Sequence, residues 1–371
     1  MEHYLDNAAT TRVCPEAAEA ALRVMTEVYG NPSSTHTKGR EAKKLLDQSR
    51  KEVADALGAR DSSEVVFTSC GSESDNWAIL SGAEAMKRQG RHVISSLTEH
   101  DAVRRSLEIL ESRGFAVTRL KPDSTGRILP EAVAEALRED TVLVTLMMVN
   151  NETGAVTDIH AVSETMKRAG SSALLHTDAV QAFRKIPFQA RNLGADLISV
   201  SGHKIHAPKG IAALYIRSGL KLKPLIVGGG QESDRRAGTE PLPQIAAFAA
   251  ACRQEPKTEQ IRAMKQAAVR MLTQSVPELL CLETDAPHIL SVSMPGWRSE
   301  VLMNFLEGQE VYVSRSSACK QGKRSHVLEA IGMKPAVIDG ALRIGFSRYT
   351  TEEDLQALVS GLTAARGLAH R

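Results

Sequence analysis

Short apolar runs alternate with amphipathic segments from about residue 15 to residue 250. The runs are rich in Val, Ile and Leu and too short for typical globular helices, so they predict β-strands at 65–69, 92–96, 116–120, 142–149, 173–178, 197–202 and 213–216. Helical periodicity appears between them, at 41–57, 74–89, 103–112, 130–138 and 159–168, with Pro130 suited to a first helical turn. This alternation predicts an α/β fold whose mostly parallel sheet is covered by helices.

The pattern changes after about residue 250. A long helix is expected at 257–275, short strands at 289–293, 311–314 and 341–346, and a last helix at 352–365. Residues 308–326 combine Gly, Ser, Lys and Arg without a clear period, and we expect a mobile loop there. The prediction is a large domain over 15–250 and a smaller α+β domain formed by 1–14 and 251–371, which carries this loop.

Composition narrows the class of protein. The chain of 371 residues has a formal net charge of +2, which gives no reason to expect nucleic acid or a membrane as the main partner. The densest apolar stretch, 245–252, is far shorter than the ~20 residues that span a bilayer. The five cysteines form no CxxC pair, and the N-terminus does not resemble a secretory signal. We therefore expect a cytoplasmic protein.

Polar residues gather where the predicted strands end, which is where open α/β sheets bind ligands. At 68–76, TSCGSESDN, a strand ends and a helix begins, which favours a phosphate site, although an ordinary turn with Ser72 as N-cap gives the same pattern. Asp178 ends an apolar strand and needs a cation or donors. Lys204 follows another strand and is a candidate nucleophilic amine. His203 and His206 could instead bind zinc, but no further ligands follow at the usual spacing.

Two further strand ends carry polar groups. His100 follows Glu99 after one strand, and Asn150, Asn151 and Glu152 follow the most apolar strand, where turn formation is the simpler interpretation. A phosphate cup, an acid, a lysine and a histidine at one sheet edge are typical of a pyridoxal phosphate site, in which the lysine forms a Schiff base and the acid pairs with the pyridinium nitrogen.

These motifs resemble those of the cysteine desulfurases, in the class V aminotransferase superfamily, over nearly the whole chain. The matching segments are YLDNAATT, GNPSSTH, TSCGSESDN, TEHDAV, NNETG, HTDAVQ, SGHKIHAPKG, RRAGTE and SRSSAC, in the order found in that family. The resemblance implies the type I pyridoxal-phosphate transferase fold, with a mixed, mostly parallel seven-stranded sheet in the large domain. It also implies pyridoxal 5'-phosphate as cofactor and no metal.

The resemblance assigns the cofactor residues. Lys204 binds the cofactor covalently, His100 stacks on its ring and transfers protons, and Asp178 pairs with the ring nitrogen. Asn151 and Gln181 contact the side of the ring that carries the phenolic oxygen. The phosphate falls to a group of small and polar residues: Gly71, Ser72, Ser201 and His203. Thr239 resembles a residue that reaches the phosphate of a neighbouring subunit, which implies a homodimer.

The resemblance also assigns the substrate residues. Arg343 binds the carboxylate of L-cysteine, with Asn31 nearby, and a bidentate guanidinium suits that role. Cys319 takes the sulfur as a persulfide, L-alanine leaves, and the sulfur passes to an acceptor protein for iron–sulfur clusters, tRNA thiolation or a thio-cofactor. Lys320, Lys323 and Arg324 flank Cys319; cations lower the pKa of a thiol, but they could equally form a solvated basic loop.

The chain departs from the family pattern in places. Cys70 stands where glycine is usual, which would be costly if that position needed a positive φ. Asp101 follows His100 where a basic or neutral residue is common, and the segment after Cys319 is shorter and more basic. We expect the other four cysteines to be structural. Two alternatives remain: another class V pyridoxal enzyme, such as an aminotransferase or a cysteine β-lyase, and a sulfur-carrier scaffold without chemistry.

Overall fold

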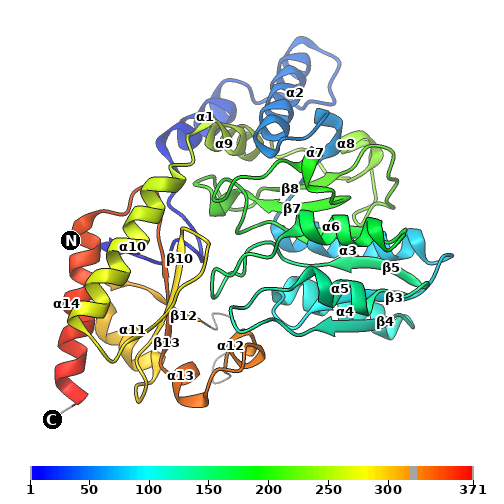
Figure 1. Cartoon of the computed structure of the whole chain (residues 1–371). Helices are drawn as coiled ribbons and strands as arrows, with labels where there is room; N and C mark the ends of the chain where they lie inside the picture. Colours follow the sequence, from blue (N-terminus) through cyan, green and yellow to red (C-terminus); the bar gives the residue numbers. More distant parts are fainter. Residues whose placement is uncertain (1, 317–323, 370–371) are drawn as a thin grey trace.

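The computed structural model describes residues 2–316 and 324–369. The larger lobe is built on a seven-stranded sheet with the order β2-β8-β7-β6-β5-β3-β4 (Figure 1). Its strands are β2 (Val65–Thr68), β3 (His92–Ser96), β4 (Ala116–Leu120), β5 (Thr141–Thr145), β6 (Leu174–Asp178), β7 (Leu197–Ser201) and β8 (Ala212–Ile216). The sheet is mixed and mostly parallel, as predicted, because β8 runs antiparallel to both neighbours while the other described pairs are parallel.

Both faces of this sheet are buried, which explains why its strands read as continuous apolar runs. Successive residues enter different cores: Leu174 packs on one face and Leu175 on the other. One face is covered by α3 (Gly71–Met86) and α4 (Asp101–Ser112), and the opposite face by α5 (Pro130–Ala136) and α6 (Ile159–Arg168) (Figure 1). Pro130 occupies the start of α5, as predicted.

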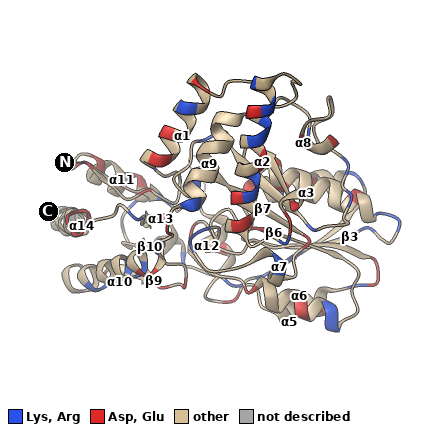
Figure 2. Cartoon of the chain, turned by 90° about the horizontal axis from the view of Figure 1, so that it is seen from above, with Lys and Arg blue, Asp and Glu red and all other residues tan. Residues whose placement is uncertain are grey.

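Three helices pack together at one end of the larger lobe: α1 (Pro15–Thr26), α2 (Thr37–Leu57) and α9 (Leu242–Arg253). The apolar stretch at 245–252 belongs to α9, where every one of these residues is buried. Short helical turns complete the lobe: η1 (Ser62–Glu64), α7 (Ala190–Leu193), η2 (Gly202–Lys204) and α8 (Gln231–Asp234). Along helices such as α1 and α2, cationic and anionic residues are interspersed (Figure 2).

The smaller lobe holds an antiparallel sheet with the order β12-β13-β10-β9. These strands are β9 (Leu280–Leu282), β10 (Ile289–Ser293), β12 (Ser314–Arg315) and β13 (Ala341–Gly345). The helices of this lobe are α10 (Thr258–Ser275), α11 (Ser299–Glu307), α12 (His326–Ala330), α13 (Pro335–Asp339) and α14 (Glu352–Ala369). None of the helices in the described part of the chain combines the length and apolar character of a membrane span.

The first residues of the chain run between the two cores. Strand β1 (His3–Tyr4) pairs with β11 (Val311–Tyr312), and Leu5 is buried in the core of the smaller lobe. Ala8 and Cys14 are buried in the core of the larger lobe. The segment between them therefore lies at the junction of the lobes.

Three details of the sequence prediction were wrong. The strand predicted at 142–149 ends at Thr145, although the N–H groups of Leu146 and Met148 still donate to oxygens of β6, at 3.2 and 3.0 Å. The predicted loop at 308–326 contains β11, β12 and the start of α12 in its described part. The helix predicted at 74–89 is α3, Gly71–Met86, and its N-cap is Cys70, so the alternative with Ser72 as N-cap is also wrong.

Candidate active site

A cavity of about 290 Å³ opens at the carboxyl ends of β6 and β7, next to the N-terminus of α3. It is lined by Ala8, Ala9, Cys70, Gly71, Ser72, Asp75, His100, Met147, Asn151, Asp178, Val180, Gln181, Ser201, His203, Lys204 and Arg343. Ten predicted site residues thus meet in one place. Thr239 and Asn31 are not among the lining residues, and Cys319 lies outside the described residues.

Lys204 reaches the cavity from the turn η2 that follows β7. Its Nζ donates to the main-chain oxygens of Ala8 at 2.8 Å and Ala9 at 2.6 Å. The turn is held against the same segment, because Thr11 donates its N–H to the His203 oxygen at 3.0 Å. This N-terminal segment matches the motif at 4–11, for which no role was predicted from the sequence. The wall that orients the lysine was therefore missed, although the motif at 4–11 marked it.

Two buried carboxyls, Asp75 and Asp178, line the cavity, and a third, Glu99, is buried near them. Asp178 ends β6 and accepts the Val180 N–H at 2.9 Å. Burial raises the pKa of Asp178, while the nearby His100 and Lys204 oppose the rise. Burial also raises the pKa of Asp75, which Asp178 raises further, and brings the pKa of Glu99 to about 8. A cation bound beside Asp178 would stabilise its charged form.

The N-terminus of α3 also lines the cavity, through Cys70, Gly71 and Ser72. Its N-cap residue, Cys70, makes no side-chain capping bond, so the first N–H groups of the helix are left for a ligand. A Cβ at position 71 would lie 2.9 Å from the Val180 Cγ2, so a larger residue would force Val180 or the start of α3 to shift. The Ser201 hydroxyl is buried without a hydrogen-bond partner among the described residues. Together these features fit an anion.

Cys70 does not behave as predicted for a structural cysteine. Its backbone is extended, with φ −166°, so the position imposes no need for glycine. The residue is exposed and lines the cavity, whereas Cys14 and Cys252 are buried. The expectation that all four other cysteines are structural is therefore wrong for Cys70.

The histidines near the cavity differ in their surroundings. His100 is the N-cap of α4, where its Nδ1 accepts the Ala102 N–H at 3.2 Å. His203 lies against Thr10, with 3.2 Å between Nδ1 and Oγ1, and burial lowers its pKa to about 4. At neutral pH, His203 is therefore an uncharged ring that can donate one hydrogen bond.

Arg343 enters the cavity from β13 of the smaller lobe, so the site draws on both lobes. One guanidinium nitrogen donates to the Asn151 main-chain oxygen at 2.9 Å, and another lies 3.2 Å from Asp6 Oδ1. Its Nε is buried with no partner among the described residues. A buried arginine with spare donors is suited to binding a carboxylate. The contact with Asp6 was not predicted.

Two neighbouring asparagines have separate roles. Asn150 is structural: its Oδ1 accepts the N–H groups of Glu152 and Thr153, both at 3.0 Å. Asn151 lines the cavity. Gln181 donates to the Ala8 oxygen at 2.8 Å and lies 3.2 Å from His288 Nε2, a buried contact that the sequence did not reveal.

Comparison with known proteins assigns the chain to a family. The family model described as aminotransferase class V matches residues 3–358. The chain belongs to the class V aminotransferases. It is 39% identical over 369 residues to the cysteine desulfurase IscS of Methanosarcina thermophila, covering 96% of this chain and 90% of the relative. It is also 39% identical to the putative cysteine desulfurase IscS 1 of Bacillus subtilis, covering 99% and 97% of the two chains.

Solved structures of class V relatives share the fold. A NifS-like protein superposes with a TM-score of 0.92 at 35% identity, covering 99% of this chain and all of that one. A NifS-like protein from Rickettsia africae gives a TM-score of 0.87 at 27% identity, covering 98% and 99%. The predicted pyridoxal-phosphate fold is thereby confirmed.

The cofactor of this class V family is pyridoxal 5'-phosphate, and the cavity fits it. The uncapped start of α3 and the unpartnered Ser201 hydroxyl suit the phosphate. The cavity also offers a carboxylate, Asp178, that would suit a protonated ring nitrogen, and an amine, Lys204, that would suit an aldehyde. The fit rests on residues from β6, β7 and α3, which lie next to one another although they are far apart in sequence.

The two remaining predicted residues lie at the surface. Asn31 is exposed, and its Oδ1 accepts the Ser33 N–H at 2.9 Å in a turn. Thr239 is exposed too. Its segment is attached to α3, because Arg236 donates to both carboxylate oxygens of Glu73 at 2.9 and 3.1 Å. The roles assigned to Asn31 and Thr239 remain predictions.

Proposed function

We propose that the protein is a pyridoxal-phosphate-dependent cysteine desulfurase that converts L-cysteine to L-alanine and transfers sulfur through Cys319 to an acceptor protein. The observation that carries the proposal is the convergence of Lys204, Asp178 and Arg343 on one cavity. The relatives named above are described as cysteine desulfurases and match nearly the whole chain, which supports the same activity.

The bound cofactor supplies an electron sink for the substrate Cα. The ionised Asp178 carboxylate keeps the ring nitrogen protonated. The charges of His100 and Lys204 favour this ionised form of Asp178. The Lys204 amine takes the proton from the substrate Cα. His100, the N-cap residue of α4, acts as a second proton carrier. Asn151 and Gln181 orient the edge of the cofactor ring.

Arg343 binds the substrate carboxylate. Its guanidinium is held by the Asn151 oxygen and by Asp6 before substrate arrives. A substrate carboxylate that accepts from two guanidinium nitrogens would replace the contact with Asp6. The bond to the Asn151 oxygen would keep the arginine in position. Asn31 is proposed to assist this binding.

Cys319 is proposed to take the sulfur. Its thiolate attacks the substrate sulfur, and a sulfur–sulfur bond forms as the bond between Cβ and sulfur breaks. The electron pair of that bond stays with Cβ, which takes a proton to become the methyl group, and Lys204 returns a proton to Cα to give L-alanine. The persulfide on Cys319 then passes its outer sulfur to a thiol of the acceptor.

The Cys319→Ser variant tests the function. We expect sulfide and alanine production from L-cysteine to fall by at least about 10³-fold, in the range seen when a nucleophile is removed. The Cys281→Ser variant is the matched control and should retain activity. Parental sulfide release by Cys319→Ser would refute the mechanism. Pyruvate in place of alanine would identify a β-lyase, and a keto acid that retains the sulfur would identify an aminotransferase.

Several finer features belong to the same proposal. We propose a homodimer, supported by exposed apolar side chains on Met25, Tyr29 and Val227, the last 80% exposed. The domain division into 15–250 and 1–14 with 251–371, and a cytoplasmic location, are proposed as well. The acceptor is proposed to act in iron–sulfur cluster assembly, tRNA thiolation or thio-cofactor synthesis.

A further inference from the structure

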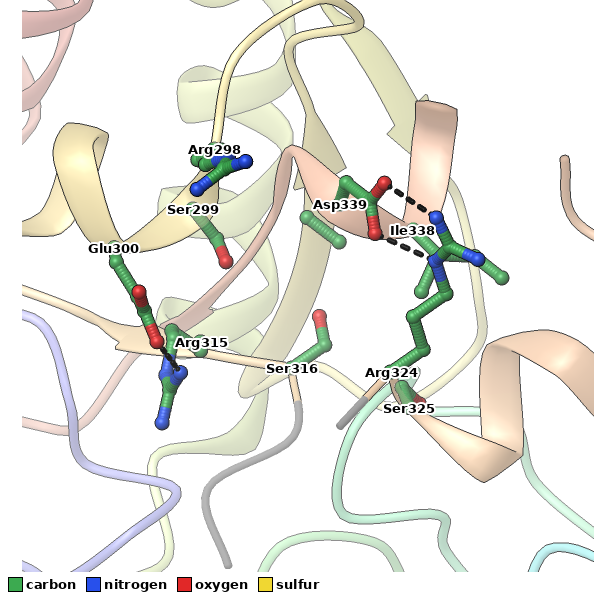
Figure 3. A pocket seen from close by; sticks show the side chains of 10 residues that line it. Arg298, Ser299, Glu300, Arg315, Ser316, Arg324, Ser325, Ile338 and Asp339 are labelled. Atoms are coloured by element: carbon green, nitrogen blue, oxygen red, sulfur yellow. Dashed lines mark hydrogen bonds and ion pairs between the residues drawn. The ribbon is translucent and has the colours of Figure 1, made fainter. Parts of the chain in front are cut away.

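A second cavity, of about 320 Å³, lies in the smaller lobe and shares no lining residue with the candidate active site. It is enclosed by the start of α11, by β12, by α13 and by the residues before α12 (Figure 3). The lining residues that matter here are polar or charged: Arg298, Ser299, Glu300, Arg315, Ser316, Arg324 and Asp339. Its size lies at the lower end of the range for ligand pockets.

Among the lining residues that the structure describes, the charges leave one cation in excess. Arg315 donates to Glu300, and Arg324 donates to both oxygens of Asp339, at 2.7 and 2.8 Å. The side chain of Arg298 makes no hydrogen bond or ion pair with any residue that the structure describes. The pKa of Asp339 is lowered mainly by its bonds with Arg324, and the charge of Arg298 lowers it further. Three arginines and two carboxylates give a net charge of +1, which suits a single negative charge.

The cavity also holds donors that lack a partner. The Ser316 hydroxyl makes no hydrogen bond with the described residues, and the residue is only 2% exposed. In Figure 3 this hydroxyl and that of Ser299 point into the space between the arginines. A buried hydroxyl without a partner is costly, so a ligand acceptor at this point would be stabilised.

The start of α11 adds a second kind of donor. The N-cap residue, Arg298, makes no side-chain capping bond, so the first N–H groups of this nine-residue helix are not satisfied by a cap. Helix N-termini favour anions for this reason. The ion pairs on either side hold Arg315 and Arg324 in place, so that the site is organised before a ligand binds.

We propose that this cavity binds a carboxylate group of the sulfur-accepting protein, and this rests on the proposed desulfurase function. A monoanionic carboxylate matches the single excess charge better than a doubly charged phosphate. A protein source is inferred from the sequence, since Ser316 comes three residues before Cys319 and Arg324 five residues after it. An acceptor that takes sulfur from Cys319 comes close to both borders of this cavity.

The test uses the holoenzyme and a fluorescein-labelled hexaglutamate peptide, with hexaglutamine as the neutral probe, in fluorescence anisotropy titrations. We expect hexaglutamate to bind and hexaglutamine not to bind. Arg298→Glu should weaken hexaglutamate binding by at least about tenfold, and Ser316→Ala by roughly threefold. Arg23→Glu, a charge reversal at another exposed arginine, on α1, is the control and should bind like the parent.

Two results would overturn the proposal: binding to Arg298→Glu that equals the parent, or an equal loss in Arg23→Glu. Free glutarate that competes as well as hexaglutamate at equal carboxylate concentration would overturn the protein source. Sulfide release with dithiothreitol as acceptor is measured on the same samples, and Arg298→Glu should keep the parental rate. If the parent releases no sulfide, the desulfurase function itself fails, which the binding data alone would not indicate.

Discussion

Lys204 and Arg343 approach the cavity from different lobes, and main-chain oxygens of distant segments hold both in place. Lys204 is held by Ala8 and Ala9, and Arg343 by Asn151. Carbonyl oxygens accept hydrogen bonds without adding a full negative charge. These carbonyl bonds orient each cation, and Arg343 is in addition paired with the Asp6 carboxylate, at 3.2 Å.

Glu99 makes folding stability depend on pH. Burial raises its pKa from 4.5 to about 8, so the folded chain keeps a proton that the unfolded chain releases within this window. The free energy of unfolding should therefore fall as pH rises from about 4.5 to 8, by at most about 5 kcal/mol from this group. Glu99→Gln should lose that part of the decline, as urea unfolding at pH 5 and pH 8.5 would show.

The glutamine can still accept through one oxygen the bonds that Glu99 Oε1 receives, from the Ser96 hydroxyl at 2.6 Å and the Met147 N–H at 3.1 Å. Glu131→Gln, at an exposed position of α5, is the control and should show the parental decline. Identical pH dependence in Glu99→Gln and the parent would contradict this account.

Helix α3 packs directly against the segment that follows β6. Its first residue packs against Val180, two positions after Asp178, so the phosphate end and the ring end of the cavity have one fixed spacing. A side chain at position 71 would push these two segments apart, since the nearest atom would lie 2.9 Å from its Cβ.

Gly71→Ala should therefore weaken pyridoxal-phosphate binding by about tenfold or more, because overpacking costs roughly 1–3 kcal/mol. Absorbance titration of the apoprotein measures the change. Gly82→Ala, on the same helix, is the control: its Cβ would meet Leu197 Cδ1 at 3.4 Å, an ordinary contact. Equal cofactor affinity in both variants would show that the packing at position 71 does not set the cofactor site.

The dimer prediction belongs to the whole molecule. If Thr239 serves the site of the neighbouring subunit, inactive Lys204→Ala and Thr239→Ala chains should complement each other. The mixed dimer has one site with an intact lysine and an intact threonine from different chains. Co-expression should then restore about a quarter of parental activity, on the simple mixing expectation that half of the dimers are mixed and have one intact site of two.

Sedimentation of the mixture shows whether dimers form at all. Lys204→Ala with Asn151→Ala is the control pair, because both residues line the same cavity of one chain and each chain retains a defective site. Restored activity in this control pair would contradict the intersubunit role. So would a Thr239 pair that forms dimers but restores no activity.

Much of the fold and site could be predicted because the relevant signals are local. The strand at 92–96 and the helix at 159–168 have the predicted bounds. The strand predicted at 142–149 was too long because apolar residues stay buried beyond the end of the strand at Thr145, as Met147 and Met148 do. Periodicity reports burial, not which hydrogen-bond partner the backbone finds.

The sequence by itself determined the class of fold, the family and the set of reactive side chains, because strand periodicity and short motifs are encoded in neighbouring residues. Only the tertiary structure decided what surrounds them: the Ala8 and Ala9 oxygens at Lys204, Asp6 at Arg343, and the exposure of Cys70. It also decided the cavity between α11, β12 and α13. These features come from segments far apart in the chain, and burial and electrostatics depend on which of those segments pack together.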